Sequence, residues 1–210
     1  MKNILCFGDS NTYGVDVMKG GRLARDLRWT GILQSLLKDE CYIIEEGLNG
    51  RTTVFEDPVG ENRNGIAAIE MILQTHIPLD LVVVMLGTND TKAHYAASAA
   101  VIARGIRNIC RKIIHFDYGI YEIPQILIVS PIHIGWNVEN SIFPEFDNTS
   151  YEKSLALATE YRKVAEEIGC LFFDASTAAE VSPVDQVHLD EIGHEMLAKA
   201  LEKEIRGILF

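Results

Sequence analysis

A serine near the start of the chain and an Asp–His pair near its end have the residue types of an acyl-transfer triad. Ser10 follows Gly8-Asp9 at the end of the first apolar run, and Asp185 stands three residues before His188. A serine nucleophile needs a base to take its proton, and a histidine base needs an acid that fixes its tautomer. On a tight loop, this Asp reaches the ring nitrogen that faces away from the serine. The three residues therefore predict a hydrolase with a Ser-His-Asp triad.

Three N–H donors are available for the oxyanion that forms when a serine attacks an ester carbonyl. Gly50 presents a bare backbone N–H, since glycine has no Cβ to obstruct the approach of a substrate. Asn89 offers its side-chain amide, and Ser10 offers its own backbone N–H. We predict an oxyanion hole from these three, although a simple turn glycine and an N-cap or turn asparagine are the structural alternatives.

Composition restricts the range of partners. The chain has 210 residues, 48% of them hydrophobic and 23% charged, which predicts one α/β domain over residues 1–210. The formal net charge of −11 argues against nucleic acid, whose phosphates need a basic face, and against anionic membrane surfaces. A small-molecule substrate fits this charge.

The four cysteines are far apart in the sequence and form no Cys-x-x-Cys pair. This spacing gives little support to a metal or redox site. Buried, reduced thiols are expected, as is typical of a cytoplasmic protein. The first residues lack the features of a secretory signal, and no run reaches the roughly 18 apolar residues of a membrane helix. We therefore expect a cytoplasmic location.

Apolar patterning predicts the elements that must position these residues. Five short runs rich in β-branched residues indicate strands at Ile4–Phe7, Cys41–Glu45, Leu81–Leu86, Ile126–Ser130 and Cys170–Phe173. Apolar residues at helical spacing lie between them. Strand–helix alternation of this kind predicts right-handed crossovers and a parallel sheet covered on both faces. The predicted fold is a three-layer α/β/α sandwich of flavodoxin-like type with a five-stranded parallel sheet.

The last two helices carry more specific signals. Thr149-Ser-Tyr-Glu152 predicts a capping box at the start of the helix that follows Asn148. The final helix, from about residue 190 to 208, places Met196, Leu197, Leu201 and Ile205 on one face.

Every polar motif falls where a predicted strand ends. The motifs are Gly8–Asn11, Gly47–Thr52, Gly87–Asp90, Pro131–Trp136 and Asp185–His188. Ligands of parallel sheets bind beyond the carboxyl ends of the strands, so we expect these motifs to meet at one edge.

Aromatic residues are candidates for a substrate pocket. A hydrophobic acyl or aryl site is expected from Trp29, Trp136, Phe143 and Phe146. Core packing for Trp29 and subunit contact for the other three are the alternatives. The loop over residues 131–148 is long and aromatic, and exposed apolar patches often mark interfaces, so we expect a homo-oligomer.

The remaining charged residues and histidines have less defined roles. Arg51 and Lys92 either tune substrate choice or pair with acidic neighbours, and His133 is a candidate substrate contact. No two histidines have metal-ligand spacing beside a carboxylate, so neither a metal nor another cofactor is expected. Structural or solvated positions are expected for His76, His94, His115 and His194.

In order and spacing, four blocks resemble those of the SGNH (GDSL-type) hydrolases. They are Gly8-Asp9-Ser10, Gly50, Gly87-Thr-Asn-Asp90 and Asp185-x-x-His188. Further similarity, at residues 28–31, 45–48 and 85–92, is greatest to the bacterial arylesterase/acyltransferase branch. The resemblance implies that Ser10 is the nucleophile, His188 the base and Asp185 its orienter, with Ser10, Gly50 and Asn89 in the oxyanion hole. One departure is Asn11, which stands where the motif has leucine and is expected to make the pocket wall more polar.

Three functions are weighed on these residues. The first is a serine esterase for small short-acyl esters, acting through a covalent acyl-enzyme that water or another alcohol resolves. The second is a carbohydrate O-acetylesterase with the same triad. The third, from a different class, is a flavodoxin-like module whose Ser10–Thr12 loop holds a phosphate or flavin. The third leaves Asp185, His188 and Asn89 without a role.

Overall fold

The computed structural model describes residues 1–210, in which five strands alternate with helices. The strands are β1 (Lys2–Gly8), β2 (Cys41–Gly47), β3 (Leu81–Met85), β4 (Gln125–Ser130) and β5 (Leu171–Asp174). The α-helices are α1 (Ser10–Tyr13), α2 (Trp29–Leu36), α3 (Gly65–His76), α4 (Ala99–His115), α5 (Asn148–Ile168) and α6 (Glu191–Leu209). Each predicted strand is present within two residues of its expected bounds.

The strands form one parallel sheet in the order β2-β1-β3-β4-β5. At its centre, Ile4 of β1 lies opposite Ile43 of β2 and Leu81 of β3. The chain passes first to the β2 edge and then crosses β1 to add strands on the other side. This is the flavodoxin-like order of doubly wound sheets, so the predicted fold class is confirmed.

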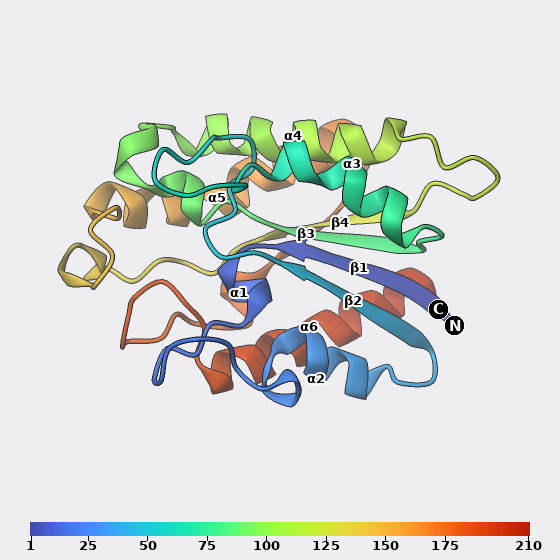
Figure 1. Ribbon diagram of the computed structural model, residues 1–210, viewed down its shortest axis with the longest axis horizontal. Helices are drawn as coiled ribbons and strands as arrows, with labels where there is room; N and C mark the ends of the chain where they lie inside the picture. Colours follow the sequence, from blue (N-terminus) through green and yellow to red (C-terminus); the bar gives the residue numbers. More distant parts are fainter.

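Two apolar clusters hold the helices on the two faces of the sheet. Side chains alternate in direction along a strand, so neighbouring residues enter opposite layers. Leu5 and Phe7 pack on the side of α3, α4 and α5, whereas Ile4 and Cys6 pack on the side of α2 and α6. All of β3 is buried, as expected of a central strand covered on both faces. Figure 1 shows the three layers, with the sheet between the two sets of helices.

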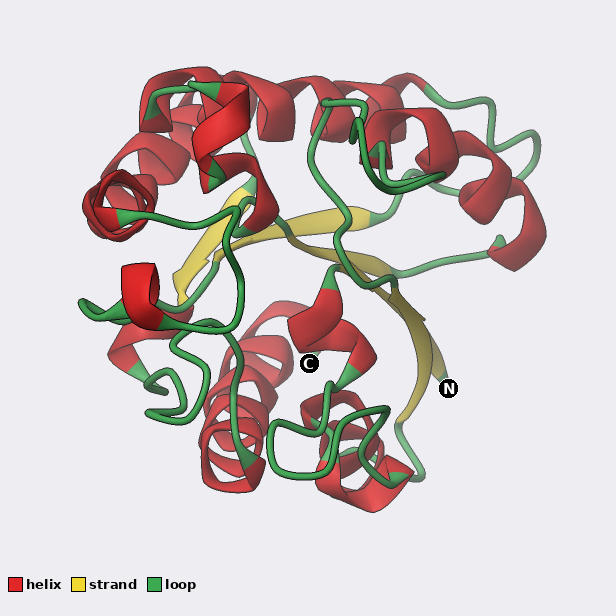
Figure 2. Cartoon of the chain, turned by 60° about the vertical axis from the view of Figure 1, so that its left-hand side comes forward, coloured by secondary structure: helices red, strands yellow, loops and turns green.

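The loops that follow the strands collect at one end of the molecule, as Figure 2 shows from that side. The two termini lie at the other end (Figure 1), where Gln125 at the start of β4 donates a 3.4 Å hydrogen bond to the Ile208 carbonyl. The polar motifs and the termini are therefore separated by the length of the sheet.

The helix α5 begins earlier than its predicted capping box. Asp147, not Thr149, is the N-cap, and its carboxylate accepts a 3.2 Å hydrogen bond from the Ser150 N–H. Ser150 Oγ in turn accepts a 3.3 Å bond from the Asp147 N–H. Aspartate caps as well as serine or threonine does, so the first good cap along the chain starts the helix.

In α6 one predicted core residue is wrong. Met196 is 51% exposed, whereas Leu197, Leu201 and Ile205 are fully buried. Adjacent residues are turned by about 100° around a helix, so Met196 lies beside the apolar stripe and not on it. No helix of the chain is both long and apolar enough to span a membrane.

Candidate active site

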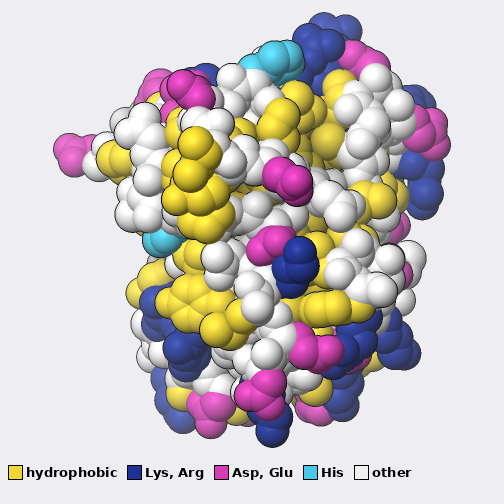
Figure 3. Space-filling view, turned by 90° about the vertical axis from the view of Figure 1, so that its right-hand side faces the viewer, with side chains coloured by type: hydrophobic (Ala, Val, Ile, Leu, Met, Phe, Trp, Pro, Cys, Tyr) yellow, Lys and Arg dark blue, Asp and Glu magenta, His cyan; other side chains and the backbone are white.

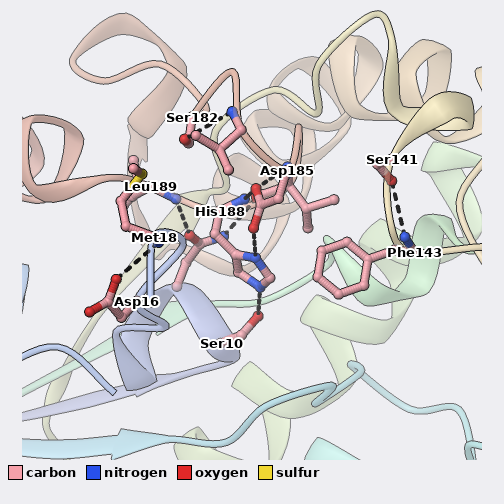
Figure 4. A network of polar contacts seen from close by, with 12 residues as sticks. Ser10, Asp16, Met18, Ser141, Phe143, Ser182, Asp185, His188 and Leu189 are labelled. Atoms are coloured by element: carbon pink, nitrogen blue, oxygen red, sulfur yellow. Dashed lines mark hydrogen bonds and ion pairs between the residues drawn. The ribbon is translucent and has the colours of Figure 1, made fainter. Parts of the chain in front are cut away.

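The structure brings Ser10, His188 and Asp185 into a hydrogen-bonded line. His188 Nε2 lies 2.9 Å from Ser10 Oγ, and its Nδ1 lies 2.6 Å from Asp185 Oδ2. Figure 4 shows the imidazole between the hydroxyl and the carboxylate. All three residues are more than nine-tenths buried. When Nδ1–H donates to the carboxylate, Nε2 is free to accept the serine proton.

A tight turn holds the segment that carries His188. Asp185 Oδ1 accepts hydrogen bonds from the N–H groups of Val187 at 3.0 Å and His188 at 2.9 Å, while Gln186 takes a φ of 66°. Burial raises the pKa of Asp185. The bonds from the His188 ring and from the two N–H groups outweigh burial, so this pKa lies below its ordinary value. The carboxylate thus stays charged beside the imidazole.

Ser10 is the first residue of α1 and follows β1 after a single residue, Asp9. The Asp9 side chain caps the helix by accepting a 3.0 Å hydrogen bond from the Asn11 N–H. A Cβ on Gly8 would meet the Thr12 hydroxyl at 2.0 Å, so the turn packs too closely for a side chain. The first N–H groups of a helix have no partner within it, which leaves that of Ser10 for a ligand.

Gly50 and Asn89 reach the same cavity as Ser10. Gly50 has a φ of 76°, in the left-handed region that favours glycine, and its N–H donates no hydrogen bond within the chain. Asn89 Nδ2 donates to the Arg51 carbonyl at 3.2 Å, and an amide carries a second N–H for another acceptor. All three predicted donors are therefore brought to one cavity.

The cavity beside Ser10 and His188 measures about 390 Å³. Phe143 and Phe146 form its apolar side. The Phe143 ring stands edge-on to the His188 imidazole, with centroids 5.5 Å apart (Figure 4). Val187 completes this wall next to the histidine. The His188 ring thus lies against an apolar surface.

Charged groups also line the cavity. Lys92 Nζ lies 3.5 Å from Asp57 Oδ2, and both side chains are more than nine-tenths buried. Arg63 and Asn49 line the cavity nearby. The Lys92 ammonium also lies 5.8 Å from the centroid of the Phe146 ring, where a cation–π contact is favourable. The charged part of the lining therefore offers both donors and acceptors.

Two of the four aromatic residues expected in the pocket are absent from its lining. Trp29 is fully buried, and its indole N–H donates a 3.1 Å hydrogen bond to the Asn11 carbonyl. Trp136 is 73% exposed, away from the cavity wall. Trp29 is therefore a core residue, which was the alternative to a place in the pocket. The expectation holds for Phe143 and Phe146 only.

Arg51, Lys92 and His133 have different positions relative to the cavity. Arg51 donates to the backbone carbonyls of Gly8, at 2.9 Å, and Glu46, so it ties the β2 loop to the end of β1. Burial lowers the pKa of Arg51 to about 10. Lys92 lines the cavity, whereas His133 does not. Of these three, only Lys92 is placed to touch a substrate.

Asn11 does not form the polar pocket wall expected from the sequence. It is 2% exposed and is not part of the cavity lining. Its side chain turns instead toward the backbone on either side of His188. Asparagine in place of the leucine of the motif therefore changes the contacts that hold the backbone beside His188, and it does not change the surface of the pocket.

Two buried carboxyl groups lie behind the serine. Burial raises the pKa of Asp9 to about 6, despite the hydrogen bond from the Asn11 N–H and the nearby charges of His188 and Arg51. Burial likewise raises the pKa of Asp90 to about 7, although the Thr53 N–H donates to both of its oxygens at 2.9 and 3.0 Å. Acidic groups in this position disfavour a phosphate at the Ser10 loop.

The charged residues of the loop between β2 and α3 were missed by sequence reasoning. Asp57 and Arg63 lie there, and both line the cavity. Residues 48–64 make a connection longer than most loops in compact domains, and such loops often carry function. The length of this loop is the one feature of the sequence that indicates a functional role. It does not identify which of the loop's side chains point into the cavity.

Residues 6–196 match the GDSL-like Lipase/Acylhydrolase family. The match covers most of the chain, and the chain belongs to this family, within the SGNH hydrolase superfamily. It is a carboxylic ester hydrolase, not the flavodoxin-like binding module of the third hypothesis. No curated protein sequence matches it.

Solved structures of esterases are similar over the whole chain. The aryl esterase of M. smegmatis is 36% identical, with a TM-score of 0.92 and 100% of both chains covered. Est24, a carbohydrate acetylesterase from Sinorhizobium meliloti, is 32% identical, with a TM-score of 0.93 and 100% of both chains covered. A carbohydrate acetylesterase family member from the same organism is 38% identical, with a TM-score of 0.91, covering 100% of this chain and 99% of its own. Both arylesterases and carbohydrate acetylesterases thus share this fold.

Proposed function

We propose that the protein is a serine esterase that cleaves small short-acyl esters through a covalent acyl-enzyme. The observation that carries the proposal is the unbroken line from Ser10 Oγ through the His188 ring to Asp185, with contacts of 2.9 and 2.6 Å. Each residue then has one role. Ser10 is the nucleophile, His188 the general base and acid, and Asp185 the group that orients the imidazole.

The reaction proceeds in two halves. Ser10 Oγ attacks the ester carbonyl as its proton passes to His188 Nε2, and the oxyanion is stabilised by Ser10 N–H, Gly50 N–H and Asn89 Nδ2. The intermediate collapses when His188 donates that proton to the leaving alcohol. Water, activated by the same ring nitrogen, then attacks the acyl-Ser10 ester, and the acid is released. An alcohol in place of water gives acyl transfer, which we include in the proposal.

The size and lining of the cavity support a small substrate. A volume of about 390 Å³ is at the small end of ligand sites. The apolar wall of Phe143 and Phe146 suits a short acyl or aryl group, and the charged side with Lys92 and Asp57 is unsuited to a long alkyl chain.

A carbohydrate O-acetylesterase is the second candidate, and the charged side of the cavity favours it. Sugar hydroxyls both donate and accept hydrogen bonds, and Asp57, Lys92, Arg63 and Asn49 together offer both kinds of group. The similarity to two carbohydrate acetylesterases also supports it. The two candidates differ in the alcohol released and not in the triad.

The experiment compares wild type, Ser10→Ala and a matched control, Ser35→Ala, on p-nitrophenyl acetate, butyrate and octanoate. Ser35 is an exposed serine on α2, remote from the cavity lining. We expect wild type and Ser35→Ala to be equally active and to lose activity as the acyl chain lengthens. Ser10→Ala should release no nitrophenolate above background. Equal activity in Ser10→Ala would refute the mechanism.

Acetylated sugars test the second candidate in the same three proteins. A kcat/KM for sugar acetates well above that for p-nitrophenyl acetate would assign the carbohydrate function. The reverse order would assign the arylesterase function. Since both activities need Ser10, the Ser10→Ala result and the substrate preference are read independently.

Two further parts of the proposal concern the oligomeric state of the protein and its location in the cell. We propose that the chain forms a homo-oligomer through the loop over residues 131–148 and works in the cytoplasm. Exposed apolar side chains in that loop support the first part. Four free cysteines, three of them buried, support the second.

A further inference from the structure

One side-chain amide, that of Asn11, holds the backbone on both sides of His188. Its Oδ1 accepts a 2.9 Å hydrogen bond from the Leu189 N–H, and its Nδ2 donates a 3.3 Å bond to the Val187 carbonyl. Val187 and Leu189 are the immediate chain neighbours of His188, as Figure 4 shows for Leu189. The amide therefore fixes the histidine by bracketing it.

Asn11 is itself held firmly. Its N–H donates to Asp9 Oδ1 at 3.0 Å, and its carbonyl accepts the indole N–H of Trp29 at 3.1 Å. The residue is 2% exposed and does not line the cavity, so it does not contact a substrate. Any effect of Asn11 on the reaction must pass through another residue.

We infer that Asn11 is a positioning residue that sets the approach of His188 Nε2 to Ser10 Oγ. This inference rests on the proposed serine mechanism. Ser10 and Asn11 are consecutive residues of α1, so the nucleophile and the clamp on the base move as one unit. The His188 segment cannot shift relative to Ser10 without breaking the bonds to the amide.

A leucine at this position has neither the donor nor the acceptor. It would leave the Leu189 N–H and the Val187 carbonyl buried without their partner, and such groups are costly to leave unpaired. The segment would relax to satisfy them elsewhere or with water. A misplacement of about 1 Å in a catalytic group can cost about 100-fold in rate, so the main effect falls on turnover.

The first test measures kcat and KM for p-nitrophenyl acetate in Asn11→Ala and Asn11→Leu. We expect kcat to fall by about 10- to 100-fold in both, with KM changed by less than about threefold, because Asn11 is outside the cavity. Circular dichroism and thermal unfolding establish that each variant is folded. If the leucine is too bulky to fold, the alanine variant alone decides the outcome.

The matched control is Tyr118→Phe. Tyr118, just beyond α4 and away from the cavity, is 4% exposed, and its hydroxyl donates a 2.9 Å hydrogen bond to the Ile113 carbonyl in α4. This variant also loses a buried bond from a side chain to the backbone. We expect it to lower the unfolding temperature without lowering kcat. An equal fall of kcat in Tyr118→Phe would mean that general loss of stability explains the Asn11 result.

The second test is a double-mutant cycle with His188→Ala. If Asn11 acts through His188, Asn11→Ala costs no further activity once the imidazole is gone. The same fold-loss with and without His188 would overturn the inference, as would a wild-type kcat in Asn11→Ala. Failure of the serine mechanism gives a different result, namely an active Ser10→Ala.

Discussion

Hydrogen bonds of two kinds converge on Ser10 and His188. One kind joins the atoms that exchange a proton in the proposed reaction, and the other joins the backbone that holds them. Asp185 takes part in both, because Oδ2 meets the ring while Oδ1 accepts the N–H groups of Val187 and His188. Substitution of Asp185 therefore disturbs the loop as well as the imidazole, whereas Asn89 is open to a cleaner test.

Removal of the Asn89 amide should slow turnover. In Asn89→Ala we expect kcat on p-nitrophenyl acetate to fall by about 10²–10³, because one donor to the oxyanion is lost. Steady-state kinetics with a folded variant measure the effect. Asn49 lines the same cavity outside the proposed oxyanion hole, so Asn49→Ala is the matched control. A fall of less than about threefold in Asn89→Ala would remove Asn89 from the hole.

The Lys92–Asp57 pair should affect the choice of alcohol. Lys92→Met keeps the apolar stem but removes the ammonium, and with it the ion pair to Asp57. If sugar acetates are substrates, we expect their KM to rise by about tenfold, whereas KM for p-nitrophenyl acetate changes little. The readout is the ratio of the two kcat/KM values. Lys199→Met, on the exposed face of α6, should leave this ratio unchanged; equal ratios in both variants would place Lys92 outside the specificity determinants.

The helices α2 and α6 meet through a buried histidine. His194 of α6 is fully buried, and its Nδ1 accepts a 3.3 Å hydrogen bond from the Trp29 N–H at the start of α2. Burial, opposed by the charge of Asp190 and reinforced by the nearby charges of His188 and Arg28, lowers the pKa of His194 to about 4. The ring is therefore neutral at pH 7 and serves as an acceptor between the two helices.

This contact predicts acid sensitivity. Between about pH 6.5 and pH 4 the unfolded chain protonates His194 while the native state does not, so the free energy of unfolding falls as the pH falls. The loss reaches about 3 kcal/mol near pH 4 and grows no further below it. Asp9 and Asp90, with raised pKa values, act in the opposite sense over the same range.

A difference measurement isolates His194. His194→Asn keeps an acceptor for the Trp29 N–H and removes the titrating ring, while Asp9 and Asp90 remain in both proteins. Urea unfolding at several pH values should show the stability of wild type, relative to the variant, decreasing from pH 7 to pH 4. A difference that does not change with pH would contradict the assignment.

The sheet could be predicted from the sequence because its strands are buried on both faces. That burial makes runs such as Leu81–Met85 apolar throughout, and the polar motifs mark where each run ends. The proposed triad could be inferred from residue types that few structural roles require together. Helix boundaries are harder to place from the sequence, since Asp147 and Thr149 both have capping side chains.

The sequence does not predict the direction in which individual side chains point. Asn11 finds its partners 176 and 178 residues further along the chain, and nothing in the local pattern points to them. The positions of Trp29 and Trp136 could not be predicted either. One lies under α1 and the other on a surface loop, and an aromatic residue is compatible with either place. Charged residues of long loops, such as Asp57, are located only by the assembled cavity.

The surface has exposed apolar residues at both ends of the molecule. Trp136 and Ile142, which are 73% and 79% exposed, lie in the loop over residues 131–148. At the other end Ile120 and Phe210 are 93% and 65% exposed. Figure 3 faces that end and shows apolar side chains scattered among charged ones. The two ends therefore offer alternative places for subunits to meet.

We expect the loop end to form the interface of the proposed homo-oligomer. Light scattering should give a mass above that of one chain, and Trp136→Glu should shift it toward the monomer because a charge is costly in an apolar interface. Ile120→Glu at the other end is the matched control and should leave the mass unchanged. A monomeric wild type, or dissociation by Ile120→Glu alone, would contradict the prediction.

The position of the termini has a practical consequence. Both lie at the amino ends of the strands, and the cavity opens beyond the carboxyl ends. A tag or a tether attached at Met1 or Phe210 is thus directed away from the mouth of the cavity. The enzyme can be anchored to a solid support by either end with the side that carries the cavity turned toward the solution, and a fusion partner there leaves the mouth of the cavity open.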